Sequence, residues 1–195
     1  MKNLNSRQKQ AQNTKRRIFD AAVSLLDEKA FGQMKIRDII KKADISIGTF
    51  YHYYTTKMDV FYETYHVADE LFENEVAPKL TLCTVQDNIM LFFDYYAKYN
   101  SEFTDFRITK LLYNTDNKFF NRNTDYGIVA VLTRLVQLGI DHKELISDPD
   151  APAMANFLMI AARGLVYHWC TEDCTYDLPV AMQKFVLRLL KIYKP

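Results

Sequence analysis

The chain has 195 residues, of which 49% are apolar and 25% are charged, with only five Gly and five Pro. This composition excludes a disordered or fibrous chain and is typical of a globular protein rich in helix. No segment reaches about 18 uninterrupted apolar residues, and the basic N-terminus lacks the apolar core of a signal peptide, so we expect a cytoplasmic protein. Its three Cys residues predict no disulfide framework.

Charge is distributed unevenly along the chain, although the formal net charge is only +1. Residues 1–57 contain 12 Lys and Arg against 5 Asp and Glu, whereas residues 58–195 contain 13 against 19. A basic segment joined to an acidic remainder is typical of a nucleic-acid-binding module attached to a domain with another task. Basic tails are also common on soluble proteins, so the pattern of residues has to decide between these interpretations.

Two helices are predicted in the basic segment, over 14–29 and 36–43, because apolar residues recur there at three- and four-residue intervals. Lys15, Arg16 and Arg17 crowd the start of the first helix. The N-terminus of a helix carries partial positive charge and disfavours cations. We therefore expect these three side chains to face an external polyanion.

A tight turn at 44–45 separates the second helix from a third, which we expect over 47–54 with Ser46 as its N-cap. Two short helices joined by so brief a turn indicate a helix-turn-helix. Thr56 and Asp59 then form a capping box, which predicts that a long fourth helix begins near residue 57.

The remainder of the chain is also predicted to be helical. The fourth helix should run to about residue 76, and later helices are expected over 84–100, 102–114, 118–140, 150–171 and 177–193. The predicted fold is therefore all-α. It has a three-helix DNA-binding domain at 1–57, with 1–12 disordered, joined by the fourth helix to an effector-binding and dimerisation domain at 58–195.

Residues 14–61 resemble the DNA-binding domain of the TetR/AcrR family of transcriptional regulators. The resemblance rests on a small residue at a turn, a Gly-Thr pair, alternating aromatic residues and a Lys that opens the next helix: Ser46, Ile47, Gly48, Thr49, Phe50, Tyr51, His52, Tyr53, Tyr54 and Lys57. It departs from the family pattern at Ala30, Met34 and Ile40. The resemblance implies a homodimer that responds to a small molecule and most often represses transcription.

The candidate DNA-binding residues are Lys15, Arg37, Ser46, Ile47, Gly48, Thr49, Tyr51, His52, Tyr53 and Lys57. Hydroxyl groups and helix N-terminal amides suit phosphate oxygens, and Gly48 allows close approach of the backbone to DNA. Ile47 and His52 are expected to read base edges. By resemblance, Arg37 reads or brackets a base and Lys57 contacts a phosphate. The aromatic run also fits plain core packing, above all for Phe50 and Tyr54.

The candidate ligand-binding residues come from the aromatic-rich second part of the chain: Phe92, Tyr96, Phe103, Tyr113, Tyr126, Arg163 and Tyr167. Aromatic side chains with a few hydroxyls are typical of small-molecule sites, so we expect a largely apolar or aromatic effector. Each aromatic residue also fits plain core. Arg163 lies in an otherwise apolar helix and needs a carboxylate, either from a ligand or from a neighbouring helix.

The last two predicted helices are expected to form the dimer interface, as the resemblance implies. The residues chosen for it are Leu158, Ala162, Leu165, Phe185, Leu189 and Ile192, which fit an intrachain core almost as well. His168, Cys170 and Cys174 could bind zinc, but a site needs four donors and helical periodicity places His168 and Cys170 on different faces. We expect neither a metal nor a cofactor.

The chain contains no Gly-rich phosphate loop, no metalloprotease motif and no nucleophile elbow, so we do not expect an enzyme. The leading hypothesis is a repressor whose two recognition helices enter successive major grooves of a pseudo-palindromic operator, about 34 to 36 Å apart or a little more. The alternative is a helical lipid- or ligand-binding module whose basic N-terminus meets anionic membrane or RNA.

Overall fold

The structure is a computed structural model that describes residues 6–114 and 125–195. The chain divides into two compact units, Met1–Glu63 and Thr64–Pro195. Helix α4 (Lys57–Leu71) begins in the first unit and ends in the second. The described residues contain helices and no strand, which confirms the predicted all-α class.

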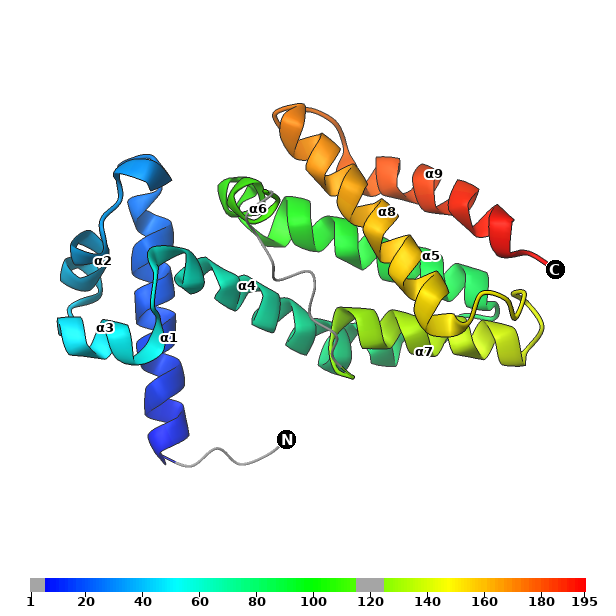
Figure 1. The fold of residues 1–195 in the computed structure, drawn as a ribbon, viewed down its shortest axis with the longest axis horizontal. Helices are drawn as coiled ribbons and strands as arrows, with labels where there is room; N and C mark the ends of the chain where they lie inside the picture. The colour runs from blue at the N-terminus through cyan, green and yellow to red at the C-terminus, as the bar shows by residue number, and fades with distance from the viewer. Residues whose placement is uncertain (1–5, 115–124) are drawn as a thin grey trace. The chain divides into compact units, whose positions relative to one another are not determined.

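The first unit consists of α1 (Ser6–Leu25), the short turn η1 (Phe31–Gln33), α2 (Ile36–Ala43), α3 (Ile47–Tyr53) and the start of α4 (Figure 1). Helix α2 packs against both α1 and α3. Its core is apolar, with Ile18, Met34, Ile39, Phe50 and Phe61 almost completely buried. Burying such side chains is the main source of stability for a unit this small, since each one contributes about 1.5–3 kcal/mol.

The N-terminal boundary of α1 corrects one prediction. The helix begins at Ser6, so residues 6–12, expected to be disordered, are helical. This stretch contains Gln, Lys, Arg and Ala, which have good helix propensity and extend a helix that is already anchored by its buried C-terminal half.

Local hydrogen bonds explain where the next helices start. The Ser46 Oγ accepts a hydrogen bond from the Thr49 amide at 3.0 Å, as expected of an N-cap. At α4, the Asp59 amide donates to Thr56 Oγ1 at 3.2 Å and the Asp59 carboxylate accepts from the Thr56 amide at 2.7 Å. Asp44 adopts a left-handed conformation, with φ of 50°, at the end of α2. The predicted cap, capping box and turn are therefore confirmed.

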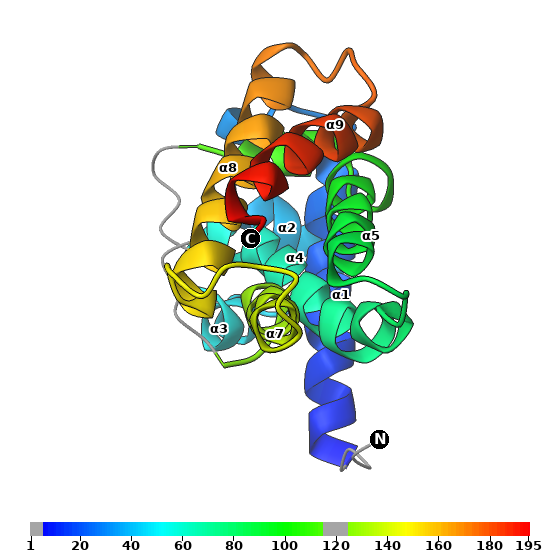
Figure 2. The same ribbon diagram turned by 90° about the vertical axis from the view of Figure 1, so that its right-hand side faces the viewer.

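The second unit contains the remaining helices. After α4 the chain continues through η2 (Phe72–Val76) and η3 (Ala77–Lys79), and then forms α5 (Val85–Lys98), η4 (Tyr99–Phe103), α6 (Phe106–Leu112), α7 (Ile128–Asp141), α8 (Ala151–Thr171), α9 (Leu178–Leu190) and η6 (Lys191–Tyr193). Helix α5 packs against α7 and α9, and α8 packs against α7 and α9. Figure 2 shows these four helices arranged around the middle of the unit.

Most predicted helix limits in this unit are close to the observed ones. The fourth helix was expected to reach residue 76, and the chain does continue in helical form to that point, although its last turn is the wider π-helical η2. The helix expected over 118–140 is observed as Ile128–Asp141, and residues 118–124 of that prediction lie outside the described residues. None of the described helices combines the length and apolarity needed to cross a membrane.

Candidate DNA-binding surface and internal cavity

The exposed face of α3 carries most of the residues predicted to contact DNA. Ile47 is 64% exposed, and Tyr51 and His52 are also exposed. Phe50 and Tyr54 lie on the opposite face and are buried, as predicted. Most of the Ile47 surface is left uncovered by the unit, so α3 has an apolar and aromatic edge available to a partner.

Gly48 lies in the first turn of α3, where a side chain would meet almost nothing within the protein. A Cβ atom placed there would have only Ser46 Oγ within 4 Å, at 3.8 Å. The fold therefore does not require glycine at this position. Close approach of an external molecule to the backbone is the remaining physical reason for it.

A groove runs between α1 and α3. Its walls include residues of α1, the Ser46 cap and residues along α3: Arg7, Gln10, Thr14, Arg17, Ser46, Gly48, Thr49, His52 and Tyr53. The Ser46 and Thr49 hydroxyls are 2.8 Å apart and fix each other in this wall. The groove thus brings the predicted Ser46, Gly48, Thr49, His52 and Tyr53 together.

The structure gives different surroundings to Lys15, Arg17 and Arg37, the cations that were expected to face DNA. The Lys15 ammonium contacts Glu63 Oε1 at 2.6 Å, and Arg17 donates to the Ala43 and Asp44 carbonyls at 2.6 and 2.9 Å. These two cations therefore have partners within the unit, contrary to the expectation that they need an external polyanion. Arg37, on α2, is exposed. Periodicity along one helix could not have identified Glu63, which lies 48 residues from Lys15.

Lys57 also has a structural role that the sequence did not show. Its ammonium donates to the Phe31 and Met34 carbonyls at 2.6 and 2.8 Å and lies 4.3 Å from the centre of the Phe31 ring. The side chain therefore ties the first turn of α4 to η1. An ammonium has three N–H donors, and two of them serve these carbonyls.

Replacing Lys57 by Met keeps the length of the side chain but leaves two carbonyls without their donor. Hydrogen bonds to charged groups contribute about 1.5–3 kcal/mol each, so we expect a clear loss of stability in the first unit. Hydrogen exchange of peptides from η1 and α4 should become faster, while exchange in α8 stays the same. Lys41→Met, at an exposed position of α2, is the control. Unchanged exchange in Lys57→Met would show that the two hydrogen bonds contribute little.

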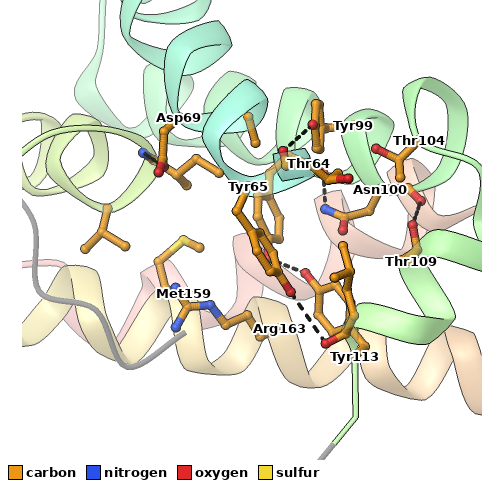
Figure 3. Close-up of a pocket in the computed structure, with 15 residues that line it drawn as sticks. Thr64, Tyr65, Asp69, Tyr99, Asn100, Thr104, Thr109, Tyr113, Met159 and Arg163 are labelled. Carbon is orange, nitrogen blue, oxygen red and sulfur yellow. Dashed lines mark hydrogen bonds between the residues drawn. The ribbon is translucent and has the colours of Figure 1, made fainter. Parts of the chain in front are cut away.

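The second unit contains a partly open cavity of about 60 Å³ (Figure 3). Its apolar wall is formed by Ala68, Leu112, Ile128, Val129 and Met159, and its polar wall includes Thr64, Tyr96, Asn100, Thr109, Tyr113 and Arg163. These residues come from α4, α5, η4, α6, α7 and α8. A cavity with apolar walls and a few converging polar groups is the usual form of a small-molecule site.

Hydrogen bonds fix most of the polar wall. The Thr109 hydroxyl donates to the Asn100 carbonyl at 2.8 Å, and the Asn100 amide donates to the Tyr96 carbonyl at 2.8 Å. The Tyr96 and Tyr113 hydroxyls are hydrogen-bonded to each other. The wall is therefore largely pre-organised.

Burial determines the protonation of the two phenols. It raises the pKa of both Tyr96 and Tyr113 above the ordinary value, and the positive charge of Arg163 opposes this rise in each case. Both hydroxyls therefore remain protonated at neutral pH and can donate hydrogen bonds.

The structure brings together only some of the predicted ligand-binding residues. Tyr96, Tyr113 and Arg163 line the cavity, whereas Phe92 is buried in the core against Phe72. Three further predicted residues are exposed: Phe103 (63%), Tyr126 and Tyr167. None of these three residues lines the cavity, so their predicted role in ligand binding stays a prediction. Sequence reasoning missed Thr64, Asn100 and Thr109, whose polarity within apolar helices was the only available signal.

The predicted dimer residues on α8 also need correction. Leu158 is 1% exposed and Ala162 is fully buried, so both belong to the core of the unit. Leu165, Phe185 and Leu189 are half-buried, and Ile192 is exposed. The exposed apolar face of α8 consists instead of Phe157, Ile160 and Tyr167, with Gly164 between the last two.

His168, Cys170 and Cys174 do not gather into a metal site. The His168 Nδ1 lies 3.1 Å from the Tyr176 hydroxyl, and burial raises the pKa of the Cys170 thiol to about 12. No cluster of three or more His, Cys, Asp or Glu suited to a metal ion occurs within residues 6–114 and 125–195.

A helix-turn-helix with an exposed α3, and a second helical unit with an internal cavity, define the class of one-component DNA-binding regulators. Residues 18–64 match the family model described as "Bacterial regulatory proteins, tetR family". This match covers the helix-turn-helix and the start of α4, and it agrees with the resemblance predicted from the sequence.

Known proteins similar to the whole chain point to the same fold. The chain is 24% identical to the fatty acid metabolism regulator protein of Bacillus subtilis over 181 residues, which are 89% of this chain and 91% of the relative. The structure of FadR from Bacillus subtilis in complex with stearoyl-CoA matches with a TM-score of 0.68 and 20% sequence identity. The match covers 89% of this chain and 96% of the FadR chain. Thermus thermophilus FadR, solved with lauroyl-CoA, has a TM-score of 0.71 at 21% identity, covering 90% and 93%.

Proposed function

We propose that the protein represses transcription by binding a pseudo-palindromic operator and releases it when a small molecule enters the central cavity. The observation that carries this proposal is the first part of α3. Ile47, Gly48, Tyr51 and His52 are exposed there behind a formed Ser46 cap, although three of them are apolar or aromatic or have no side chain. A capped helix with such an edge suits the major groove, where apolar contacts and hydrogen bonds read base edges.

Operator binding in this proposal requires a homodimer, because a palindromic site has two equivalent halves. The apolar face of α8 formed by Phe157, Ile160 and Tyr167 supports such an interface. These residues follow each other at intervals of three and seven along the helix, so they share one side of it. A second copy of the chain that presents the same face would bury all of them in an isologous contact.

The relatives suggest a more specific second candidate, a regulator of fatty acid metabolism that responds to acyl-CoA. Its support is the similarity over about nine-tenths of the chain to a fatty acid metabolism regulator and to structures solved with stearoyl-CoA and lauroyl-CoA. Identities of 19–24% leave the residues that contact such a ligand open to change, so the lining of the cavity has to be considered by itself.

Selection of bound sequences from random duplex DNA tests the proposal directly. We expect a palindromic motif whose half-sites lie about one helical turn apart, and an affinity that falls steeply with salt because phosphate contacts release counterions. An absence of preference over random competitor DNA would contradict the proposal. Binding to anionic vesicles or to RNA under the same conditions would support the lipid- or RNA-binding alternative instead.

A further inference from the structure

The central cavity contains a buried polar group that nothing in the described part of the chain satisfies. Thr64 is only 6% exposed, and its hydroxyl has no hydrogen-bond partner there. The Thr64 carbonyl accepts a hydrogen bond from the Tyr99 hydroxyl at 2.7 Å, which holds this turn of α4 in place. A hydroxyl left unsatisfied inside a protein is destabilising. On a cavity wall it marks a position where a ligand can supply the missing partner.

Further hydrogen-bond donors line the same cavity. The Tyr96 and Tyr113 hydroxyls are hydrogen-bonded to each other, so one O–H of the pair remains for another acceptor, and the positive charge of Arg163 acts on both phenols. The guanidinium group offers five N–H donors in a plane that matches both oxygens of a carboxylate. This part of the wall therefore favours a group that is negatively charged and accepts several hydrogen bonds.

Negative charge enters the described cavity lining at one position. Asp69 is the single carboxylate among the described residues that line the cavity, and its Oδ1 accepts a hydrogen bond from the Ile128 amide at 3.1 Å. Figure 3 shows Asp69 and Tyr113 at opposite sides of the cavity, with Arg163 on the α8 side. An anion bound beside Arg163 and Tyr113 would thus avoid Asp69, and its apolar part would contact Leu112 and Met159.

The size of the cavity limits the ligand. The cavity has a volume of about 60 Å³, and one water molecule needs about 10–15 Å³ of such a volume. The cavity therefore has room for about four to six non-hydrogen atoms. An acyl chain of twelve or more carbons would extend beyond this space, and it would bring methylene groups against a guanidinium and two phenols.

From these observations we infer that the effector is a compact organic carboxylate, bound by Arg163, Tyr96, Tyr113 and Thr64, rather than a long-chain acyl-CoA. This inference rests on the proposed function and specifies the ligand class of its cavity. The carboxylate accepts hydrogen bonds from the guanidinium, from the one hydroxyl of the Tyr96–Tyr113 pair that does not donate to the other, and from the Thr64 hydroxyl, and a short apolar body fills the space beside Met159.

Binding to the full chain can be measured with butyrate and with butyramide, which has the same number of non-hydrogen atoms and no charge. Titration calorimetry and thermal shift at matched ionic strength should show binding of butyrate at least about tenfold tighter than that of butyramide, since charge-assisted hydrogen bonds are roughly twice as strong as neutral ones. Lauroyl-CoA should bind more weakly than butyrate.

Two variants connect this binding to the cavity. Arg163→Gln should remove the preference for butyrate over butyramide, whereas Lys194→Gln, which removes a positive charge from an exposed position, should retain it. Thr64→Val keeps the shape of the side chain without its hydroxyl. It should melt at the same temperature as the parent or higher when no ligand is present, and it should bind butyrate several times more weakly. This variant tests the inference even if Arg163→Gln does not fold.

Measuring whether a ligand releases the operator distinguishes a failure of the carboxylate inference from a failure of the repressor proposal. If the chain binds a selected operator and butyrate, but not butyramide, releases it, both proposals are supported. If lauroyl-CoA releases the operator and butyrate does not, or if butyrate and butyramide bind equally, the carboxylate inference is overturned and the repressor proposal stands. If no operator is found while butyrate binds through Arg163, the repressor proposal fails and the assignment of the cavity stands alone.

Discussion

Replacing Ile160 by Asp should convert the protein from a dimer to a monomer. Ile160 is 59% exposed and lies between Phe157 and Tyr167 on the apolar face of α8. In an isologous interface the substitution appears twice, and each copy buries a carboxylate without a partner. A dimer that binds both half-sites at once binds about 10²–10⁴ times more tightly than a single subunit on one half-site. Operator affinity should therefore fall by at least about 100-fold in the monomer.

Sedimentation velocity and fluorescence anisotropy with the selected operator measure the two effects. The control is Phe103→Asp, since Phe103 is similarly exposed in the same unit but lies on η4 instead of α8. This control should remain dimeric and keep its affinity for the operator. A dimeric Ile160→Asp protein with normal affinity would show that α8 is not the interface.

The apolar residues of α8 show that sequence periodicity does not always distinguish buried from exposed positions. In the first unit, each helix has an apolar face and a polar face. The buried positions Ile18, Ile39 and Phe50 could therefore be predicted from the helical period of 3.6 residues. Helix α8 is apolar on most of its surface. Leu158 and Ile160 are therefore indistinguishable in the sequence, although the first is buried and the second is exposed.

The cavity could be predicted only in part, for a different reason. Tyr96, Tyr113 and Arg163 were identified because aromatic residues and a cation within apolar helices are conspicuous. Thr64 and Thr109 reach the same cavity from α4 and α6, and only the packing of distant helices brings them together. Phe103 shows the opposite case, since this aromatic side chain at the end of η4 is exposed to solvent and does not line the cavity.

The DNA-binding surface was easier to predict, because its helices are short and their boundaries are encoded locally. The Ser46 cap and the Thr56–Asp59 capping box involve residues only three positions apart. The partners of Lys15 and Lys57 could not be found in this way, since they lie 23 to 48 residues away. Both lysines look like phosphate contacts in the sequence, and the structure shows that each one also connects α1 or η1 to α4.

Replacing Gly48 by Ala should change folding stability and operator affinity in opposite directions. Within the unit, the new methyl group would meet only Ser46 Oγ at 3.8 Å, which is an ordinary van der Waals distance. Alanine is favoured over glycine in a helix by about 0.5–1 kcal/mol, so the melting temperature should rise slightly. If α3 approaches the DNA backbone at this residue, the methyl group prevents that approach, and operator affinity should fall by about tenfold, which corresponds to about 1.4 kcal/mol.

The opposite signs make this result diagnostic, because a merely misfolded variant would lose stability and affinity together. Gly32→Ala provides the control in the same unit: no atom lies within 4 Å of a Cβ built there, and η1 is separate from α3. Thermal unfolding and anisotropy titration of both variants against the selected operator give the comparison. Equal operator affinity for Gly48→Ala and Gly32→Ala would mean that the backbone of α3 does not approach DNA at Gly48, and recognition would then depend on exposed side chains such as Ile47, Tyr51 and His52.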